Sequence, residues 1–321
     1  MTRPLPPVRS SAGRLIAALS IALAATTASA HGFAGKRFFP ATLAIDDPFV
    51  SDELSLPTIT QQRLRASEDA PALRETDFAV DMSKRMTEHL GIGLGTTYEW
   101  LRPQAGDRTS GFDNLDASVK YQVYTSAEHE AILSVGVDAD IGGTGTRRVG
   151  RESFSTLTPT VFFGKGFGDL PAAAQYLRPL AVTGSVGVGF PTRSASVSID
   201  DEGSPSVERH PHVLQWGLAL EYSVPYLQSF VKDIGLAAPF DRMIPVVEVA
   251  LATPLDRGGG GTTGTINPGV LWAGQYAQVS VEAVIPVNDR TGIRGVGWMA
   301  QLHFFLDDLF PGSLGKPLLR H

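Results

Sequence analysis

Histidines and the absence of cysteine limit the chemistry open to this 321-residue sequence. With no cysteine, the chain can hold no disulfide scaffold, no thiolate zinc site and no thiol nucleophile. No Gly-x-Ser-x-Gly elbow is present either, so a serine nucleophile has no local signature. Seven histidines remain as candidates, at positions 31, 89, 129, 210, 212, 303 and 321.

Four of these histidines invite a chemical interpretation. Cleavage after Ala30 would leave His31 as an N-terminal amine beside an imidazole, a pair that can chelate copper, although a solvated terminus is the simpler interpretation. His210 and His212 form a His-x-His pair near three acids, which favours a polar loop over a weak metal site. His303 lies in the inward phase of the last alternating run and could serve an embedded hydrolase, but the sequence identifies no partner serine. We therefore expect no catalytic residue, no metal and no cofactor.

Charged residues recur at positions opposite apolar rows, and most of them are acids. A charge facing the middle of a bilayer costs about 2–4 kcal/mol, so these residues are expected to face a wet interior. Rings of Asp and Glu attract cations, although some of these acids could be paired or solvated at the rims. Glu130 lies in the same inward-facing phase. The predicted solute path consists of Asp77, Asp81, Arg85, Glu99, Asp116, Lys120, Asp138, Asp140, Glu221, Glu248, Glu282 and His303.

These positions require long β-strands. Apolar and polar residues alternate in runs of about nine to thirteen, the length that a tilted strand needs to cross a bilayer. Clear examples are residues 115–123, 133–140, 180–188, 214–222 and 296–304. Aromatic residues near the run ends are typical of an interfacial girdle. A soluble sandwich would also alternate, but its strands are usually shorter.

The connectors predict how these strands are joined. Polar loops at 102–111, 142–153, 191–210, 254–263 and 288–294 alternate with short turns at 86–88, 125–129 and 273–275, and with longer connectors at 166–177 and 224–242. Helical spacing in 224–242 predicts one short amphipathic helix. An even strand count requires a first strand at Ser55–Arg65. We therefore predict an all-β fold, a single closed antiparallel transmembrane β-barrel of about 12 strands spanning 54–306, with a periplasmic lead-in at 31–53 and a periplasmic tail at 307–321.

The first thirty residues have the pattern of a cleaved export signal. Three arginines precede an apolar stretch from Leu15 to Ala25, and Ala28-Ser29-Ala30 fits a signal-peptidase site. Eleven apolar residues form a helix of only about 16 Å, too short to span a bilayer. The net charge of −6 argues against a nucleic-acid partner. We expect a bacterial outer-membrane protein whose partners are lipid and a small solute.

Four segments carry a family resemblance: residues 35–40 (GKRFFP), 110–115 (SGFDNL), 154–171 (FSTLTPTVFFGKGFGDLP) and 301–311 (QLHFFLDDLFP). Together they resemble a group of uncharacterised proteobacterial exported proteins that are regarded as outer-membrane β-barrels. More loosely, the pattern resembles outer-membrane transporters of the phenol-degradation pathway (MetA-type). The resemblance implies a fold and a compartment, and transfers no catalytic residue.

The expected function is passive passage or uptake of a small solute through an acidic, cation-favouring lumen. One alternative is an outer-membrane-embedded, lipid-active hydrolase centred on His303. Another is a structural barrel with a plugged lumen. Bilayer conductance that falls when Asp138, Glu248 and Glu282 are neutralised would favour the channel, and lipid hydrolysis lost in His303→Ala would favour the enzyme.

Overall fold

The computed structural model describes residues 32–66, 71–199 and 205–319. The predicted export signal, its cleavage site, His31 and His321 lie outside the described residues. No helix in the described ranges is long and apolar enough to cross a membrane.

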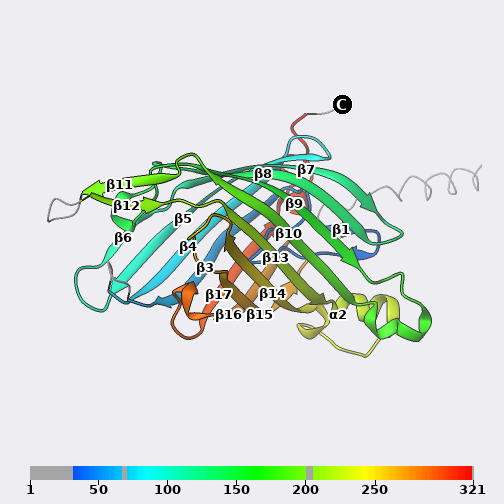
Figure 1. The fold of residues 1–321 in the computed structure, drawn as a ribbon. Helices are drawn as coiled ribbons and strands as arrows, with labels where there is room; N and C mark the ends of the chain where they lie inside the picture. Colours follow the sequence, from blue (N-terminus) through cyan, green and yellow to red (C-terminus); the bar gives the residue numbers. More distant parts are fainter. Residues whose placement is uncertain (1–31, 67–70, 200–204, 320–321) are drawn as a thin grey trace, which may run out of the picture. The chain divides into compact units, whose positions relative to one another are not determined.

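Twelve antiparallel strands form a closed barrel, which confirms the predicted fold class and strand number (Figure 1). The ring closes where β17 (Gly297–Phe305) pairs with β3 (Glu53–Leu64). The other ten strands are β4 (Leu73–Arg85), β5 (Leu90–Pro103), β7 (Leu115–Ser126), β8 (Ala131–Ile141), β9 (Thr156–Gly166), β10 (Leu180–Pro191), β13 (Val213–Tyr222), β14 (Met243–Pro254), β15 (Thr263–Ala273) and β16 (Ala277–Pro286).

The first strand exists despite Pro57, close to the predicted range of 55–65. Its pairing with β4 shifts register between Ser55 and Thr58, so Pro57 lies in an irregularity of the ladder. Proline cannot donate a ladder hydrogen bond, and a bulge is one of the few places where a strand tolerates it. The bulge therefore allows this proline-containing segment to form the strand that completes the ring.

The apolar rows face outward. On β8, Leu133, Val135 and Val137 are 36–43% exposed, whereas Ser134 between them is fully buried. The same contrast separates Val279 and Val281 from their neighbours on β16. Successive side chains of a strand point to opposite faces. A soluble sandwich would bury these apolar rows between its sheets, so their exposure excludes that fold.

The two ends of the barrel differ in their connections. Short connections join β4 to β5, β7 to β8 and β15 to β16 at what we call the turn end. The predicted helix lies there too, as α2 (Val224–Tyr226) and the π-helical turn η3 (Leu227–Val231) that continues it. The opposite end, the loop end, carries two features that the sequence analysis did not predict: β6 (Thr109–Phe112), and the hairpin of β11 (Ala195–Ile199) with β12 (Pro205–Arg209) (Figure 1).

Residues 32–52, which we call the lumen segment, run inside the barrel. The segment contains the small ladder of β1 (Phe33–Ala34) and β2 (Arg37–Phe38). Gln278 of β16 donates a 2.6 Å hydrogen bond to the carbonyl of Ala41, and Ser134 of β8 donates one to the carbonyl of Pro48. Residues 31–53, predicted to be a periplasmic lead-in outside the barrel, instead lie against the inner wall over 32–52.

Apolar packing explains why the lumen segment lies inside. Phe39 and Phe49 form one buried cluster with Ala34 and with the inward residues Ile132 and Ala181. Farther along, Ile45 is buried in a second cluster with residues of β13, β14 and β15: Ala219, Ile244, Val246 and Leu271. Burying such side chains removes apolar area from water at about 25 cal/mol per Å².

The C-terminal residues pack against the turn end rather than extending away from it. After β17, a short helix α3 (Leu306–Leu309) is followed by turns. The backbone N–H groups of Leu318 and Leu319 donate to the carbonyls of Arg85 and Met86, where β4 ends. Residues 306–319 therefore cover part of the turn end.

Candidate functional site

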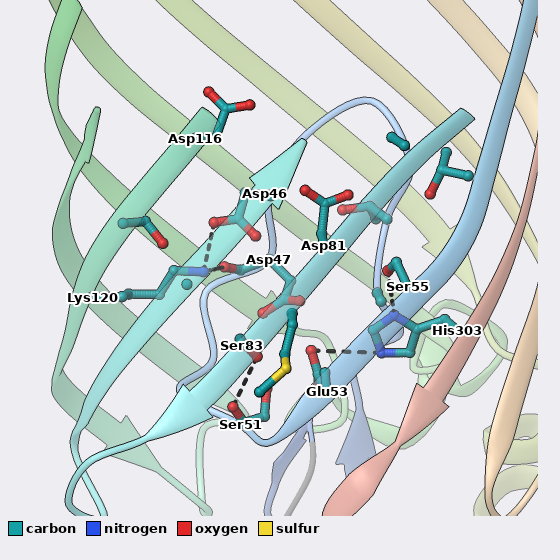
Figure 2. Close-up of a pocket in the computed structure, with 18 of the residues that line it drawn as sticks. Asp46, Asp47, Ser51, Glu53, Ser55, Asp81, Ser83, Asp116, Lys120 and His303 are labelled. Carbon is teal, nitrogen blue, oxygen red and sulfur yellow. Dashed lines mark hydrogen bonds and ion pairs between the residues drawn. The ribbon is translucent and has the colours of Figure 1, made fainter. Parts of the chain in front are cut away.

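A cavity of about 540 Å³ lies between the lumen segment and one side of the barrel wall. Its wall comes from β17, β3, β4, β5, β7 and β8, and its other side from residues 41–53. Figure 2 shows side chains from both sides pointing into it. Six carboxylates and one lysine line the cavity: Asp46, Asp47, Glu53, Asp81, Asp116, Asp138 and Lys120.

Strand register explains how distant residues meet in this wall. His303 pairs with Ser55, Ser55 with Asp81, Asp81 with Gly95, and Gly95 with Asp116. Residues opposite one another in a ladder share a face of the sheet. One cross-strand row around the barrel therefore carries an imidazole, a hydroxyl and two carboxylates.

Glycines on β5 make room for this row. A Cβ at Gly95 would lie 2.3 Å from the Asp81 carboxylate, and one at Gly93 would lie 2.3 Å from the Ser118 hydroxyl. At Gly91 the nearest side chain would be Val50 of the lumen segment, at 3.1 Å. Between Gly91 and Gly95 the inward face of β5 is thus bare backbone, and neighbouring polar side chains use the space.

Lys120 joins the barrel wall to the tip of the lumen segment. Its Nζ lies 2.6 Å from a carboxylate oxygen of Asp46 and donates a 2.7 Å hydrogen bond to the carbonyl of Asp47 (Figure 2). The same ammonium lies 4.6 Å from the centre of the Phe162 ring. Lys120 is therefore engaged with the segment, and the cavity keeps an excess of acids.

Asp47 has a perturbed acidity because the lumen segment places it inside the barrel. Burial raises the pKa of the Asp47 carboxyl from its ordinary 3.8 to about 6. Lys120 and the N–H of Phe49 oppose that shift, whereas Asp46 adds to it. One lumen carboxyl thus changes charge near pH 6.

His303 contacts a serine that sequence reasoning did not find. The Ser55 hydroxyl lies 2.9 Å from His303 Nδ1, and Glu53 lies 3.6 Å from His303 Nε2 (Figure 2). The serine sits on the first strand and the histidine on the last, so the contact forms only where the ring closes. Serine, histidine and carboxylate in this order are the groups of a nucleophile with its base.

Three of the predicted solute-path residues lie beneath the lumen segment or beside it. Glu221, Glu248 and Glu282 are each no more than 2% exposed. Glu248 accepts hydrogen bonds of 2.8, 2.8 and 3.0 Å from the N–H groups of Leu43, Ala44 and Ile45. Three donors on one carboxylate hold that part of the segment in place.

Arg85 lies at the turn end and belongs to an ionic cluster. The guanidinium Nε of Arg85 is 2.9 Å from Asp52, and Lys84 Nζ is 2.7 Å from the same carboxylate. Both cations also donate to carbonyls of residues 314–316. The cluster ties β4, the end of the lumen segment and the C-terminal residues together.

The remaining predicted residues, Asp77, Glu99 and Asp140, lie toward the loop end. Asn114 donates a 3.0 Å hydrogen bond to Asp140, and Arg151 forms an ion pair with Glu99. A smaller cavity of about 330 Å³ lies on the other side of the lumen segment and shares Asp46 and Asp138 with the larger one. The register brings the predicted residues to one inner surface, in three groups rather than one ring.

The His-x-His pair does not act as one unit. His210 contacts Ser196 at 2.8 Å and stacks on Phe154 with ring centres 4.0 Å apart. His212 instead pairs with Asp256 at 3.0 Å. The backbone N–H of His212 donates to the Asp256 carboxylate and lowers the pKa of that carboxyl. Loop geometry therefore separates the two rings.

A buried ionic cluster anchors the start of the lumen segment. Arg37 Nε lies 3.3 Å from Glu130, and Tyr226 donates a 2.8 Å hydrogen bond to the same carboxylate. The guanidinium also lies 3.9 Å from the Tyr226 ring centre and donates to the carbonyls of Arg178 and Pro179. No sequence signal links these positions, because each lies in a different connection.

The comparisons with known proteins concern the fold. No protein-family model and no curated protein matches the sequence. The chain is similar to an outer membrane channel from Pseudomonas putida F1, with a TM-score of 0.52 and 10% identity over 84% of this chain and 99% of that one. It is less similar to the NanC porin (TM-score 0.46, 10% identity, 78% and 98% covered) and to the translocator domain of autotransporter NalP from Neisseria meningitidis (0.45, 10%, 91% and 94%). The first of these shows that the fold is that of a bacterial outer-membrane β-barrel.

Proposed function

We propose that this protein is a channel of the bacterial outer membrane that passes small polar solutes and favours cations. The observation that carries the proposal is the pairing of an apolar outer face with an acidic cavity inside the barrel. An apolar band suits contact with lipid. Six carboxylates facing one lysine, itself bound to Asp46, leave the cavity negative.

The proposal assigns the two ends of the barrel to the two sides of the membrane. Outer-membrane barrels have short periplasmic turns and longer extracellular loops. The turn end, with both termini of the barrel, is then periplasmic, and an exported precursor cleaved after Ala30 delivers it there. A solute entering from the loop end would reach the acidic cavities on both sides of Asp46.

The polar cavity also bears on the family resemblance. We also propose that this protein belongs to the group of proteobacterial outer-membrane barrels that its sequence resembles. An aromatic hydrocarbon, as the resemblance to phenol-degradation transporters implies, would need an apolar path. Six carboxylates and seven hydroxyl side chains lie among the residues that line the larger cavity, so a cationic or neutral polar solute suits it better.

Planar-bilayer recording tests the proposal. The purified barrel should conduct, and its reversal potential in a KCl gradient should indicate cation preference. The double variant Asp81→Asn with Asp116→Asn should reduce that preference, whereas Glu128→Gln, at an exposed turn position, should leave it unchanged. Absence of conductance would favour the plugged structural barrel, and anion preference would overturn the assigned selectivity.

A second candidate, a hydrolase, is favoured by the contact between Ser55 and His303. In that reaction Ser55 Oγ attacks an ester carbonyl and its proton passes to His303. His303 then donates this proton to the alkoxide, which leaves as the alcohol. Water then releases the acid from the acyl-serine. The contact faces the lumen near the turn end, so the substrate would be a solute rather than a membrane lipid. Labelling of the barrel by a fluorophosphonate, lost in Ser55→Ala, would support this candidate, and no labelling would refute it.

A further inference from the structure

Three carboxylates at the loop end of the barrel lie close enough to share one ion. Glu75, Asp77 and Glu99 each offer a carboxylate oxygen, and these oxygens all lie within 4.8 Å of one another. We propose that they bind a divalent cation of the calcium class. The proposal goes beyond conduction, because the site would hold a resident ion.

Strand pairing builds the cluster. Asp77 of β4 and Glu99 of β5 are direct cross-strand partners, and Glu75 lies two residues from Asp77 on the same face. Opposite residues on one face of a sheet have their Cβ atoms about 5 Å apart. The three side chains converge on rigid strands rather than on a loop, so the arrangement is fixed by the barrel itself.

Buried atoms without a partner point to a missing ligand. Glu99 is only 3% exposed, and its Oε2 has no hydrogen-bond partner in the described part of the chain. Oδ1 of Asp77 is also buried and also has no hydrogen-bond partner among the described residues. An unpaired buried acceptor is costly, and like charges placed together are costlier. A cation bound by the two carboxylates would relieve both costs.

The neighbouring protein cation does not fill this role. Arg151, from the loop between β8 and β9, pairs with Oε1 of Glu99 and, at 2.9 Å, with Asp113. It therefore serves two carboxylates and leaves Oε2 of Glu99 unpaired. Gln62 donates a 3.4 Å hydrogen bond to Glu75 and so orients a ligand without adding charge. Four acids around one arginine leave an excess of negative charge.

The donor set indicates the class of ion. All three ligands are carboxylate oxygens, which hard cations prefer, and no nitrogen or sulfur atom is among them. Oxygens up to 4.8 Å apart can share a calcium ion at its usual bond length of about 2.4 Å. Water would complete the coordination, because calcium takes six to eight oxygen ligands.

Calorimetric titration of CaCl2 into the full, chelator-treated barrel in detergent tests the proposal. We expect one saturable site per chain. Asp77→Asn and Glu99→Gln should each weaken calcium binding by more than about tenfold. Asp81→Asn is the matched control, since it removes another inward acid from the same strand. Glu208→Gln is a second control, because Glu152, Glu208 and His210 form a separate cluster with metal-ligand spacing.

Each result bears on the proposal directly. Saturable binding that survives both controls and is lost in the two cluster variants supports it. No saturable binding overturns it, as does an equal loss in Asp81→Asn, which would indicate diffuse attraction, or a loss confined to Glu208→Gln. Heat-dependent gel mobility reports folding of each variant, and Glu75→Gln replaces any cluster variant that does not fold. Binding is measured without membrane current, so the outcome is independent of whether the barrel conducts.

Discussion

The carboxylate of Glu248 accepts a 2.8 Å hydrogen bond from the backbone N–H of Ala44, a residue 204 positions earlier in the chain. The neighbouring N–H groups of Leu43 and Ile45 donate to the same carboxylate. A buried barrel acid, which the sequence assigns to a solute path, thus holds the chain that narrows the lumen. Each such charge-assisted bond contributes about 1.5–3 kcal/mol.

Replacing this acid should loosen the lumen segment. Glu248→Ala leaves one buried and two partly buried N–H groups without this acceptor, and the cost for a buried group is about 1–3 kcal/mol. Because the chain has no cysteine, Ala41→Cys provides a unique label at a buried position of the segment. A water-soluble maleimide should label it faster in Glu248→Ala than in the parent. Asp116→Asn, also an inward acid, should leave the rate unchanged, and equal rates in all three would contradict the anchoring role.

The acidity of Asp47 should make ion selectivity depend on pH. Its pKa of about 6 exceeds the ordinary 3.8, so the carboxyl gains its proton as pH falls through 6. Because the folded state binds that proton more tightly, this group destabilises the fold above pH 6, and the penalty fades as pH falls toward 4. Cation preference measured between pH 8 and 5 should therefore decline, and Asp47→Asn should make that decline smaller. An unchanged profile in the variant would refute this assignment.

Breaking the buried pair between Arg37 and Glu130 should destabilise the protein strongly. Glu130→Ala leaves the arginine uncompensated, which costs about 3–5 kcal/mol for buried pairs. Urea unfolding in detergent measures the change in free energy of unfolding. The exposed pair between Arg65 and Asp289 is the control, because its loss in Asp289→Asn should cost no more than about 1 kcal/mol. Similar losses for the two pairs would show that burial is not the cause.

Gly217 of β13 is expected to be intolerant of a methyl group. A Cβ there would lie 2.2 Å from Cγ2 of Ile45 in the lumen segment and 2.9 Å from the carbonyl of Val249. Gly217→Ala should increase labelling of Ala41→Cys, since the segment must move. Adding Ile45→Ala removes the closest contact and should restore slow labelling. Failure of that double variant to recover would place the strain in the sheet instead.

Alternation predicted the fold because it is a local property of each strand. Leu133 and Ser134 take opposite faces whichever strand lies beside them. The even count then demanded a strand at 55–65, and β3 confirms it. Turns and loops are likewise recognised from their local composition. The helix in 224–242 was predicted from the helical spacing of its apolar residues, which is also a local pattern.

Register and the path of the lumen segment could not be predicted in this way. The contact between Ser55 and His303 depends on ring closure and on register shifts near both residues, and alternation fixes only the phase of a strand. The lumen segment has no period, and side chains far away in sequence bind its backbone. Asp46 and Asp47 therefore fell in the predicted periplasmic lead-in, although they form part of the cavity.

The lumen segment leaves the turn end at Arg37 and returns there at Asp52, directly before β3. Both ends of the segment therefore lie at one mouth of the barrel, and the chain between them enters and leaves through that mouth. Because β3 begins one residue after Asp52 and pairs with β17, the register of this seam sets the depth at which the segment ends. A slip of one residue in the seam would reposition Asp52 along the barrel axis and turn the side chains of β3 to the opposite face.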